Sequence, residues 1–278
     1  MTEITLPEYL SSDACARLPA GVLTVLFCED EAHLGATLAH ARAQAPAHIL
    51  AIGRAASLAG EAGVTAIAAD LADRFARDRA LNLLIDRFEG RWLHWLNNGE
   101  FFFFPWSETR TLGDIAGFLQ NERRRLLYAY TLDLYAPDLP DGGADPRAGR
   151  MWFDRDAYCG FPKQDHQLTV YGGLGWRFEE LFAPHWLEIG RANLFRASRS
   201  ARIGRDLIFD DPAYRTVSAP WHHSPTGAVM SLRRARHLIS HPGFIALQDK
   251  LMWEGSVPFD WRSAQLLDLG MIEPGQWF

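Results

Sequence analysis

The sequence is poor in cysteine and contains no long apolar run. Its three cysteines (Cys15, Cys28 and Cys159) are an odd number without a CxxC pair, which argues against a disulfide framework and a zinc site. No apolar stretch approaches the roughly 20 residues of a membrane-spanning helix. The first residues lack the charged and apolar regions of a signal peptide. We therefore expect a cytoplasmic protein without a transmembrane segment.

Positive charge is also scarce. The chain has 28 Lys and Arg against 34 Asp and Glu, a net charge of -6, so we expect no general affinity for nucleic acid. Lys163 and Lys250 are the only lysines, and arginine is the better fork for phosphate. Hydrophobic residues at 48% and charged residues at 22% are typical of a globular protein, and 278 residues suffice for one large domain or two small ones.

The first hundred residues alternate between strand-like and helix-like segments. Residues 21–27 (GVLTVLF) are a continuous apolar run, typical of a strand covered on both faces. Hydrophobic patterns also predict strands at 48–52, 64–68 and 91–104, the last interrupted in its middle, and helices at 32–44 and 71–88. The resulting β-α-β-β-α-β order predicts a doubly wound, mostly parallel sheet.

The second part of the chain is less regular. The pattern predicts a helix at 112–123 and a strong strand at 125–135. Residues 137–150 (PDLPDGGADPRAGR) are typical of a linker or of an active-site lid. Beyond them we predict two helices, at 229–239 and near 244–253, within an irregular region rich in tryptophan, glycine and proline.

One segment, 91–139 (RWLHWLNNGEFFFFPWSETRTLGDIAGFLQNERRRLLYAYTLDLYAPDL), carries a family resemblance. It resembles the middle of bacterial family-2-type glycosyltransferases of the GT-A fold. In these a buried strand ends in W-x-x-x-x-D-x-D-E and is followed by an aromatic run and proline, a helix, and a strand ending in L-D-x-Y. The later stretches YGGLGWRFEE, APWHHSPTGAVMS and LGMIEPGQWF resemble the same family.

The resemblance implies a fold and an activity. The fold is α/β and GT-A-like: a Rossmann-like, mostly parallel sheet flanked by helices, with an irregular Trp-rich acceptor-side region. Residues 1–136 would bind the nucleotide-sugar donor, and 137–278 would form the acceptor-side half of the same domain. The activity is sugar transfer from that donor to a saccharide or surface-polysaccharide acceptor. The Asp-x-Asp pair usually holds Mg²⁺ or Mn²⁺ against the diphosphate.

The Asp-x-Asp pair itself is altered. Matching the motif places Asn97 and Gly99 at the aspartate positions, with Glu100 as the following glutamate. Two interpretations remain. In one, the protein still transfers sugar, with a weak metal site or with Arg and His donors in place of the ion. In the other, it is a catalytically inactive GT-A-like binding or assembly protein.

The resemblance and the local chemistry suggest further site residues, each with a structural alternative. Glu29 and Asp30 follow the first strand, where the family contacts the nucleoside, although acidic residues there also suit a helix start. His222 or His223 would meet the diphosphate or, with Glu100, hold a metal. Asp165 is a candidate base for the acceptor hydroxyl. Trp176 and Arg177, after a run of glycines, would contact the sugar.

Three other interpretations bear on these residues. Asn-Gly is a strong turn signal, but the family match favours a functional site over a plain turn at 97–100. The glycines of 171–177 do not clearly join a strand to a helix, so we reject a dinucleotide-binding motif there. A third class of protein, a small-molecule α/β enzyme unrelated to sugars, lacks any nicotinamide motif. The donor, the acceptor, the stereochemistry and the oligomeric state are not predicted.

Overall fold

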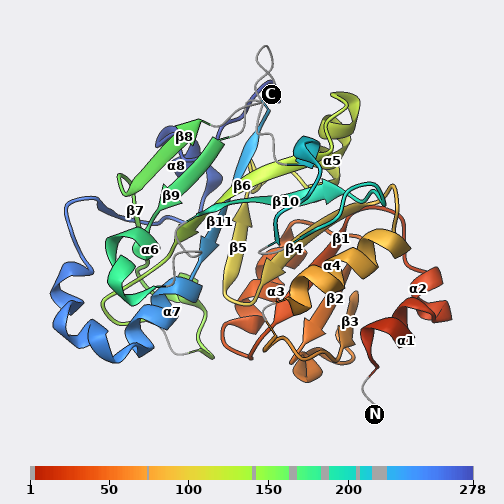
Figure 1. Cartoon of the computed structure of the whole chain (residues 1–278), viewed down its shortest axis with the longest axis horizontal. Helices are drawn as coiled ribbons and strands as arrows, with labels where there is room; N and C mark the ends of the chain where they lie inside the picture. The colour runs from red at the N-terminus through yellow and green to blue at the C-terminus, as the bar shows by residue number, and fades with distance from the viewer. Residues whose placement is uncertain are drawn as a thin grey trace.

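A large mixed sheet forms the centre of the computed structural model, which describes residues 4–73, 75–139, 142–162, 168–182, 188–204, 207–214 and 224–277. The sheet has eight strands in the order β3-β2-β1-β4-β10-β6-β11-β5 (Figure 1). The two further sheets are the pairs β12-β7 and β8-β9. The strands are β1 (Leu23–Cys28), β2 (His48–Gly53), β3 (Val64–Ile67), β4 (Trp92–Asn97), β5 (Glu100–Phe103), β6 (Leu126–Asp133), β7 (Trp152–Asp154), β8 (Tyr158–Pro162), β9 (Leu168–Gly172), β10 (Gly190–Arg196), β11 (Thr226–Ser231) and β12 (Ser256–Pro258).

Strand direction determines which residues meet at each edge of the large sheet. Strands β3, β2, β1 and β4 are parallel, and β6 and β11 share their direction. Strands β10 and β5 run the opposite way. The carboxyl ends of six strands and the amino ends of β10 and β5 therefore lie at one edge. Open parallel sheets bind ligands at this edge.

Helices cover both faces of the parallel part. The α-helices are α1 (Leu6–Leu10), α2 (Asp13–Ala16), α3 (Leu34–Ala43), α4 (Ala76–Arg87), α5 (Leu112–Asn121), α6 (Leu174–Arg177), α7 (Arg233–Ser240) and α8 (Ser263–Asp268). Leu23, Val25 and Phe27 pack in one core with residues of α1 and α4, whereas Leu26 and Cys28 pack in another with α3 and α5. Side chains of β1 alternate between the two cores because successive residues of a strand point to opposite faces. Helix α6 lies against β9, and α7 lies next to α6 and against β6 (Figure 1).

The predicted parallel strands are confirmed. Those expected at 21–27, 48–52, 64–68 and 91–96 are β1, β2, β3 and β4, adjacent in one sheet. All six residues of β1 are buried, as a strand covered on both faces requires. The described structure is thus a mixed α/β fold with a mostly parallel, Rossmann-like sheet.

Several predicted boundaries were wrong. The helix expected at 71–88 begins only at Ala76, and Val229–Ser231 belong to β11 rather than to the helix expected at 229–239. The helix expected at 244–253 is instead two 3₁₀ segments, Pro242–Ala246 and Gln248–Lys250. The apolar residues of strand β11 lead directly into helix α7 at Arg233. Hydrophobicity alone therefore does not show where the strand ends and the helix begins.

The interrupted strand at 91–104 is two strands joined by a turn. Strand β4 pairs with β1 and β10, whereas β5 pairs with β11 at the far end of the sheet. Asn98 and Gly99 form the turn between them, and Gly99 has a φ of +76°. The preference against a hairpin turn was therefore wrong, because Asn-Gly acts here as its turn chemistry predicts.

The glycines of 171–177 join β9 to the four-residue helix α6, contrary to prediction. Gly173 has a φ of +69°, and a Cβ there would come within 2.4 Å of Oδ2 of Asp133. The same oxygen accepts a hydrogen bond from the backbone N–H of Leu174 at 2.8 Å. Glycine is needed here because the backbone closely approaches a buried carboxylate.

The large sheet crosses the expected boundary between 1–136 and 137–278. Strand β10, from the second half, lies between β4 and β6 of the first. The expected linker or lid at 137–150 contacts the start of α3, where the backbone N–H of His33 donates to the carbonyl of Gly142 at 2.5 Å. Within the described ranges, no helix has the length and apolarity needed to cross a membrane.

Candidate functional site

A cleft of about 380 Å³ lies at the edge where the strand ends meet. Its charged and polar lining comes from segments far apart in the sequence: Glu29 follows β1, Arg77 lies on α4, Asn97 ends β4, Glu100 begins β5, Arg191 lies at the start of β10, and Arg233 begins α7. Strand direction brings these residues together, because β10 and β5 begin where β4 ends. Arginine is the predominant cation of the site.

Glu100 is the most buried charge of the cleft, with 2% of its side chain exposed. Nη1 of Arg191 donates to Oε1 of Glu100 at 3.1 Å, and Nη2 donates to Oε2 at 2.8 Å. The backbone N–H and side-chain amide of Asn97 also donate to Oε2, at 2.8 and 3.1 Å. Burial would raise the pKa of Glu100, but the charge and hydrogen bonds of Arg191 outweigh it and lower that pKa to about 2. Glu100 is therefore ionised at neutral pH.

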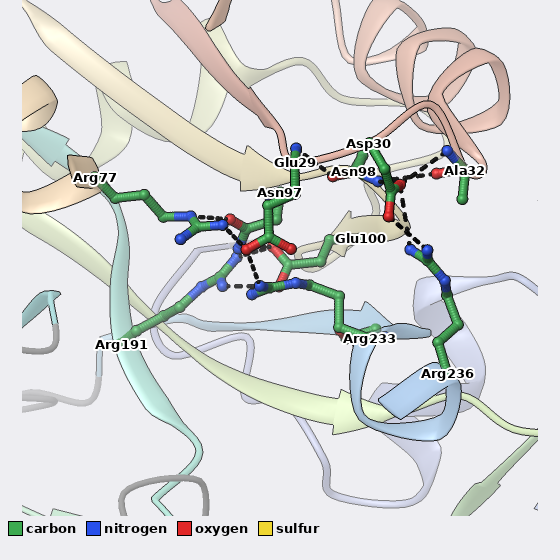
Figure 2. Close-up of polar contacts among 11 residues, drawn as sticks. Glu29, Asp30, Ala32, Arg77, Asn97, Asn98, Glu100, Arg191, Arg233 and Arg236 are labelled. Atoms are coloured by element: carbon green, nitrogen blue, oxygen red, sulfur yellow. Dashed lines mark hydrogen bonds and ion pairs between the residues drawn. The ribbon is translucent and has the colours of Figure 1, made fainter. Parts of the chain in front are cut away.

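Arg77 and Arg233 converge on Glu29 (Figure 2). Nη2 of Arg77 donates to Oε1 of Glu29, and Nη2 of Arg233 donates to the same oxygen at 2.8 Å. Nε of Arg77 donates to Oδ1 of Asn97 at 2.8 Å, which connects this pair to Glu100. Burial and the nearby charge of Arg233 lower the pKa of Arg77 to about 10, so it stays cationic at neutral pH.

Arg191 is held rigidly by three partners. Besides its bidentate contact with Glu100, its Nε donates to Oδ1 of Asn193 at 2.9 Å. Its Cζ lies 3.9 Å from the centroid of the Trp95 ring, close enough for a cation–π contact. The guanidinium is thus fixed at the cleft wall before any ligand binds.

Asn98 ties the loop after β1 to the turn between β4 and β5. Its Oδ1 accepts from the backbone N–H of Glu29 at 3.1 Å, and its Nδ2 donates to Oδ1 of Asp30 at 2.6 Å. Arg236 pairs with the other oxygen of Asp30 at 2.6 Å (Figure 2). These contacts fix the backbone that presents Glu29 to the cleft.

A second cavity, of about 960 Å³, adjoins the cleft at the carboxyl ends of β1, β2 and β3. The two share Glu29, Leu71 and Ala72 in their linings. The second cavity is also lined by Asp30, Arg54 and Asp70. Another cavity of about 450 Å³ beside β3 has no charged residue in its lining, so it offers no chemistry comparable to the cleft.

The donor set does not fit a divalent cation. Both carboxylate oxygens of Glu100 accept hydrogen bonds from the Arg191 guanidinium, so a cation beside Glu100 would also meet the positive charge of Arg191. Among the residues that the structure describes, no group of three or more His, Cys, Asp and Glu could hold a metal. Mg²⁺ and Mn²⁺ depend on several oxygen ligands. The described part of the cleft supplies cationic guanidiniums instead.

Comparisons with models of known protein families and with curated proteins gave no match. The chemistry of the two cavities and the sequence resemblance are therefore the guides to function.

The structure brings some of the predicted site residues together. Glu29, Asn97 and Glu100 line the cleft, and Asp30 lines the adjoining cavity. Gly99 lines neither: its N–H donates to Oγ1 of Thr37 at 2.9 Å, so it faces α3. The altered motif thus contributes two side chains to the cleft, and its glycine serves the turn.

Trp176 and Arg177 line neither cavity. Trp176 is 52% exposed on α6. Nη1 of Arg177 donates to both oxygens of Asp154, at 2.9 and 3.2 Å, and the pair is buried. Arg177 therefore has a structural partner away from the cleft.

Three predicted residues fall outside the described ranges: the candidate base Asp165 and the histidines His222 and His223. Their roles stay predictions, as does the metal set of Glu100 with His222.

The sequence interpretation missed Arg77, Arg191 and Arg233. The arginine bias of the sequence suits phosphate binding, but it does not indicate which arginines would bind the phosphate. One signal was available: the RRAR run of 233–236 follows an apolar strand-like run, and basic residues there lie near a strand end. Arg77 and Arg191 carry no local signal.

We expect Gly99→Ala to lower the free energy of unfolding by about 1 kcal/mol, because the side chain disfavours a positive φ. The nearest atom to a Cβ at Gly99 is 3.7 Å away, so the cost comes from the backbone and not from a clash. Gly117, in the middle of α5 with open space around it, is the matched control: Gly117→Ala should stabilise by roughly 0.5–1 kcal/mol. Urea denaturation measures both, and equal effects of the two variants would contradict the role of the turn.

Proposed function

We propose that this protein is a glycosyltransferase that moves a sugar from a nucleoside diphosphate sugar to a saccharide acceptor, surface polysaccharide included. The observation that carries the proposal is the pair of adjoining cavities at the carboxyl-end edge of the sheet. One is walled by arginines and the other is wider and lined by the ends of β1, β2 and β3. A nucleoside diphosphate sugar has a matching division into an uncharged nucleoside and an anionic diphosphate.

In the proposed complex the nucleoside occupies the wider cavity, near Asp30. Glu29 lies where the two cavities meet, and the diphosphate lies beside Arg77 and Arg233. Guanidinium groups form strong, directional hydrogen bonds with phosphate oxygens. The mostly parallel sheet and the altered Asp-x-Asp motif at the cleft support a GT-A-like arrangement.

The reaction forms one bond and breaks another at the anomeric carbon. The acceptor hydroxyl oxygen bonds to this carbon, while the bond from the carbon to the terminal phosphate oxygen breaks and its electron pair leaves with the nucleoside diphosphate. The hydroxyl proton passes to a carboxylate base, for which Asp165 is the candidate. The guanidiniums stabilise the negative charge that develops on the leaving diphosphate.

The test is thermal unfolding with a panel of UDP, GDP, dTDP and CMP sugars, followed by an assay for released nucleotide. A ligand that binds only the folded state must raise the unfolding temperature. We expect one nucleoside diphosphate sugar to do so, and its nucleoside diphosphate to be released when saccharide acceptor is added. CMP sugars, with a single phosphate, are the comparison. No stabilisation by any sugar nucleotide or free nucleoside diphosphate would contradict the proposal.

One observation favours the alternative of a binding protein without transferase activity. Glu29 and Glu100, the two carboxylates that face Arg77, Arg191 and Arg233, both accept hydrogen bonds from guanidiniums. In the free protein, neither is therefore available to take a proton from an acceptor. The same experiment separates the two functions, because a binding protein would be stabilised by the donor without releasing nucleotide with any acceptor.

A further inference from the structure

The arginine cluster of the cleft, formed by Arg77, Arg191, Arg233, Glu29 and Glu100, has two unlike carboxylates. Glu100 is buried and held by four N–H donors. Glu29 has 37% of its side chain exposed, and its Oε1 accepts from Arg77 and Arg233. Of the two, Glu29 alone lines the adjoining cavity as well as the cleft. It is the carboxylate that an incoming anion can replace.

Charge balance in the cleft leads to the same conclusion. Within the arginine cluster, three guanidiniums face two carboxylates, so 3 - 2 leaves one positive charge. Arg234, Asp78 and Glu188 also line the cleft, which gives four arginines and four carboxylates in all. An anion therefore finds no large excess of positive charge. It binds by taking the place of a carboxylate.

We propose that Arg77 and Arg233 bind the diphosphate of the donor without a metal ion, and that Glu29 occupies their hydrogen-bonding positions until the diphosphate displaces it. This deepens the proposed function, on which the identity of the diphosphate as part of a sugar nucleotide rests. The free protein keeps these two partly buried guanidiniums paired, because an unpaired charge shielded from water is costly. When the diphosphate arrives, Glu29 turns toward solvent, where its charge is hydrated.

The role of Glu100 is different in this arrangement. It holds Arg191 and the amide of Asn97 at the cleft wall and does not bind a cation. The oxygen of the same amide holds Nε of Arg77. The altered motif thus orients an arginine where the family's aspartates would hold a metal.

Inorganic pyrophosphate tests this inference, because it carries the diphosphate charge without nucleoside or sugar. In calorimetry with EDTA we expect wild-type protein to bind pyrophosphate, with an affinity that Mg²⁺ or Mn²⁺ does not raise. The affinity should fall as salt rises, since ions screen the partly exposed arginines. These measurements need no variant. Absence of binding in EDTA, or binding only with a divalent ion, would overturn the proposal.

Two variants test the exchange of Glu29. Glu29→Gln removes the competing charge and should tighten pyrophosphate binding about tenfold, whereas Arg233→Met should weaken it about tenfold or more. Arg79→Met is the matched control, because Arg79 lies two residues beyond Arg77 on α4, pairs with Asp73 at the surface and lines neither cavity. Its affinity should stay within about twofold of wild type. Weaker or unchanged binding by Glu29→Gln would overturn the exchange.

The outcomes separate this inference from the proposed function. Pyrophosphate binding with no response to any sugar nucleotide would support the arginine site and contradict the transferase. Sugar transfer that requires Mn²⁺, with no pyrophosphate binding in EDTA, would support the transferase and overturn the metal-free site.

Discussion

Replacing Glu100 with glutamine should lower the free energy of unfolding by about 3 kcal/mol, because it leaves the buried guanidinium of Arg191 without its counter-charge. The two form a bidentate pair in which Glu100 is 2% exposed and Arg191 12%. The pKa of Glu100 falls from 4.5 to about 2, which corresponds to a stabilisation of the same order. The surface pair of Arg42 and Glu61 is the control, where Glu61→Gln should cost less than about 1 kcal/mol.

The pH dependence of this effect has a defined sign. The pKa of Glu100 is lower in the folded state than in the unfolded state, so its stabilisation is complete above about pH 4.5 and is lost as the pH falls toward 2. The difference in unfolding free energy between wild type and Glu100→Gln should therefore shrink over this window. Urea denaturation between pH 7 and pH 3 measures it. A difference that is constant with pH would show that Glu100 is not held ionised by Arg191.

The same variant separates two roles for Glu100. If Glu100 were a metal ligand, its loss would abolish binding of the proposed donor by the folded protein. If Glu100 instead anchors Arg191, its loss lowers stability but leaves Arg77 and Arg233 in place for the proposed binding of the diphosphate. We therefore expect the donor affinity of folded Glu100→Gln to be retained.

The sequence predicted the parallel core well, for a physical reason. A strand covered on both faces is a nearly continuous apolar run, and 21–27 and 48–52 are such runs, the first followed closely by Glu29 and the second closed by Gly53. Residues 229–231 were wrongly predicted as helical, because an apolar strand that leads directly into a helix shows no break between the two. The position of β10 in the sheet was not predicted either, because no local sequence pattern identifies an antiparallel strand that lies between two parallel strands.

The candidate site was predicted only in part. Glu29 was named because the family resemblance places nucleoside contacts after the first strand, and Asn97 and Glu100 because they match the positions of the family's acidic motif. Arg77 lies 48 residues from Glu29 and Arg191 lies 91 from Glu100, so neither ion pair follows from spacing. Arg177 was chosen because it follows glycines and a tryptophan. Its partner Asp154 is 23 residues earlier, at the end of strand β7.

Removing Asp154 should also destabilise the protein strongly, by about 3–5 kcal/mol, because a buried partner loses its charge. Its side chain is fully buried, and its Oδ1 accepts from Arg177 at 2.9 Å and from Nε1 of Trp253 at 2.7 Å. The hydroxyl of Tyr135 donates to the same oxygen. Asp154→Asn keeps the shape of the side chain and removes the charge, so its effect reports the ion pair more directly than alanine would.

A double-mutant cycle with Asp154→Asn and Arg177→Met then identifies the role of Arg177. Each single variant leaves one buried charged or polar group without its partner, whereas the double variant removes both partners. We therefore expect the double variant to be more stable than the sum of the single effects predicts, by about 2 kcal/mol. Donor affinity of the folded fraction should not change in any of the three, because neither residue lines the cavities. An Arg177→Met variant of wild-type stability that lost affinity for the sugar nucleotide would instead place Arg177 in the donor site.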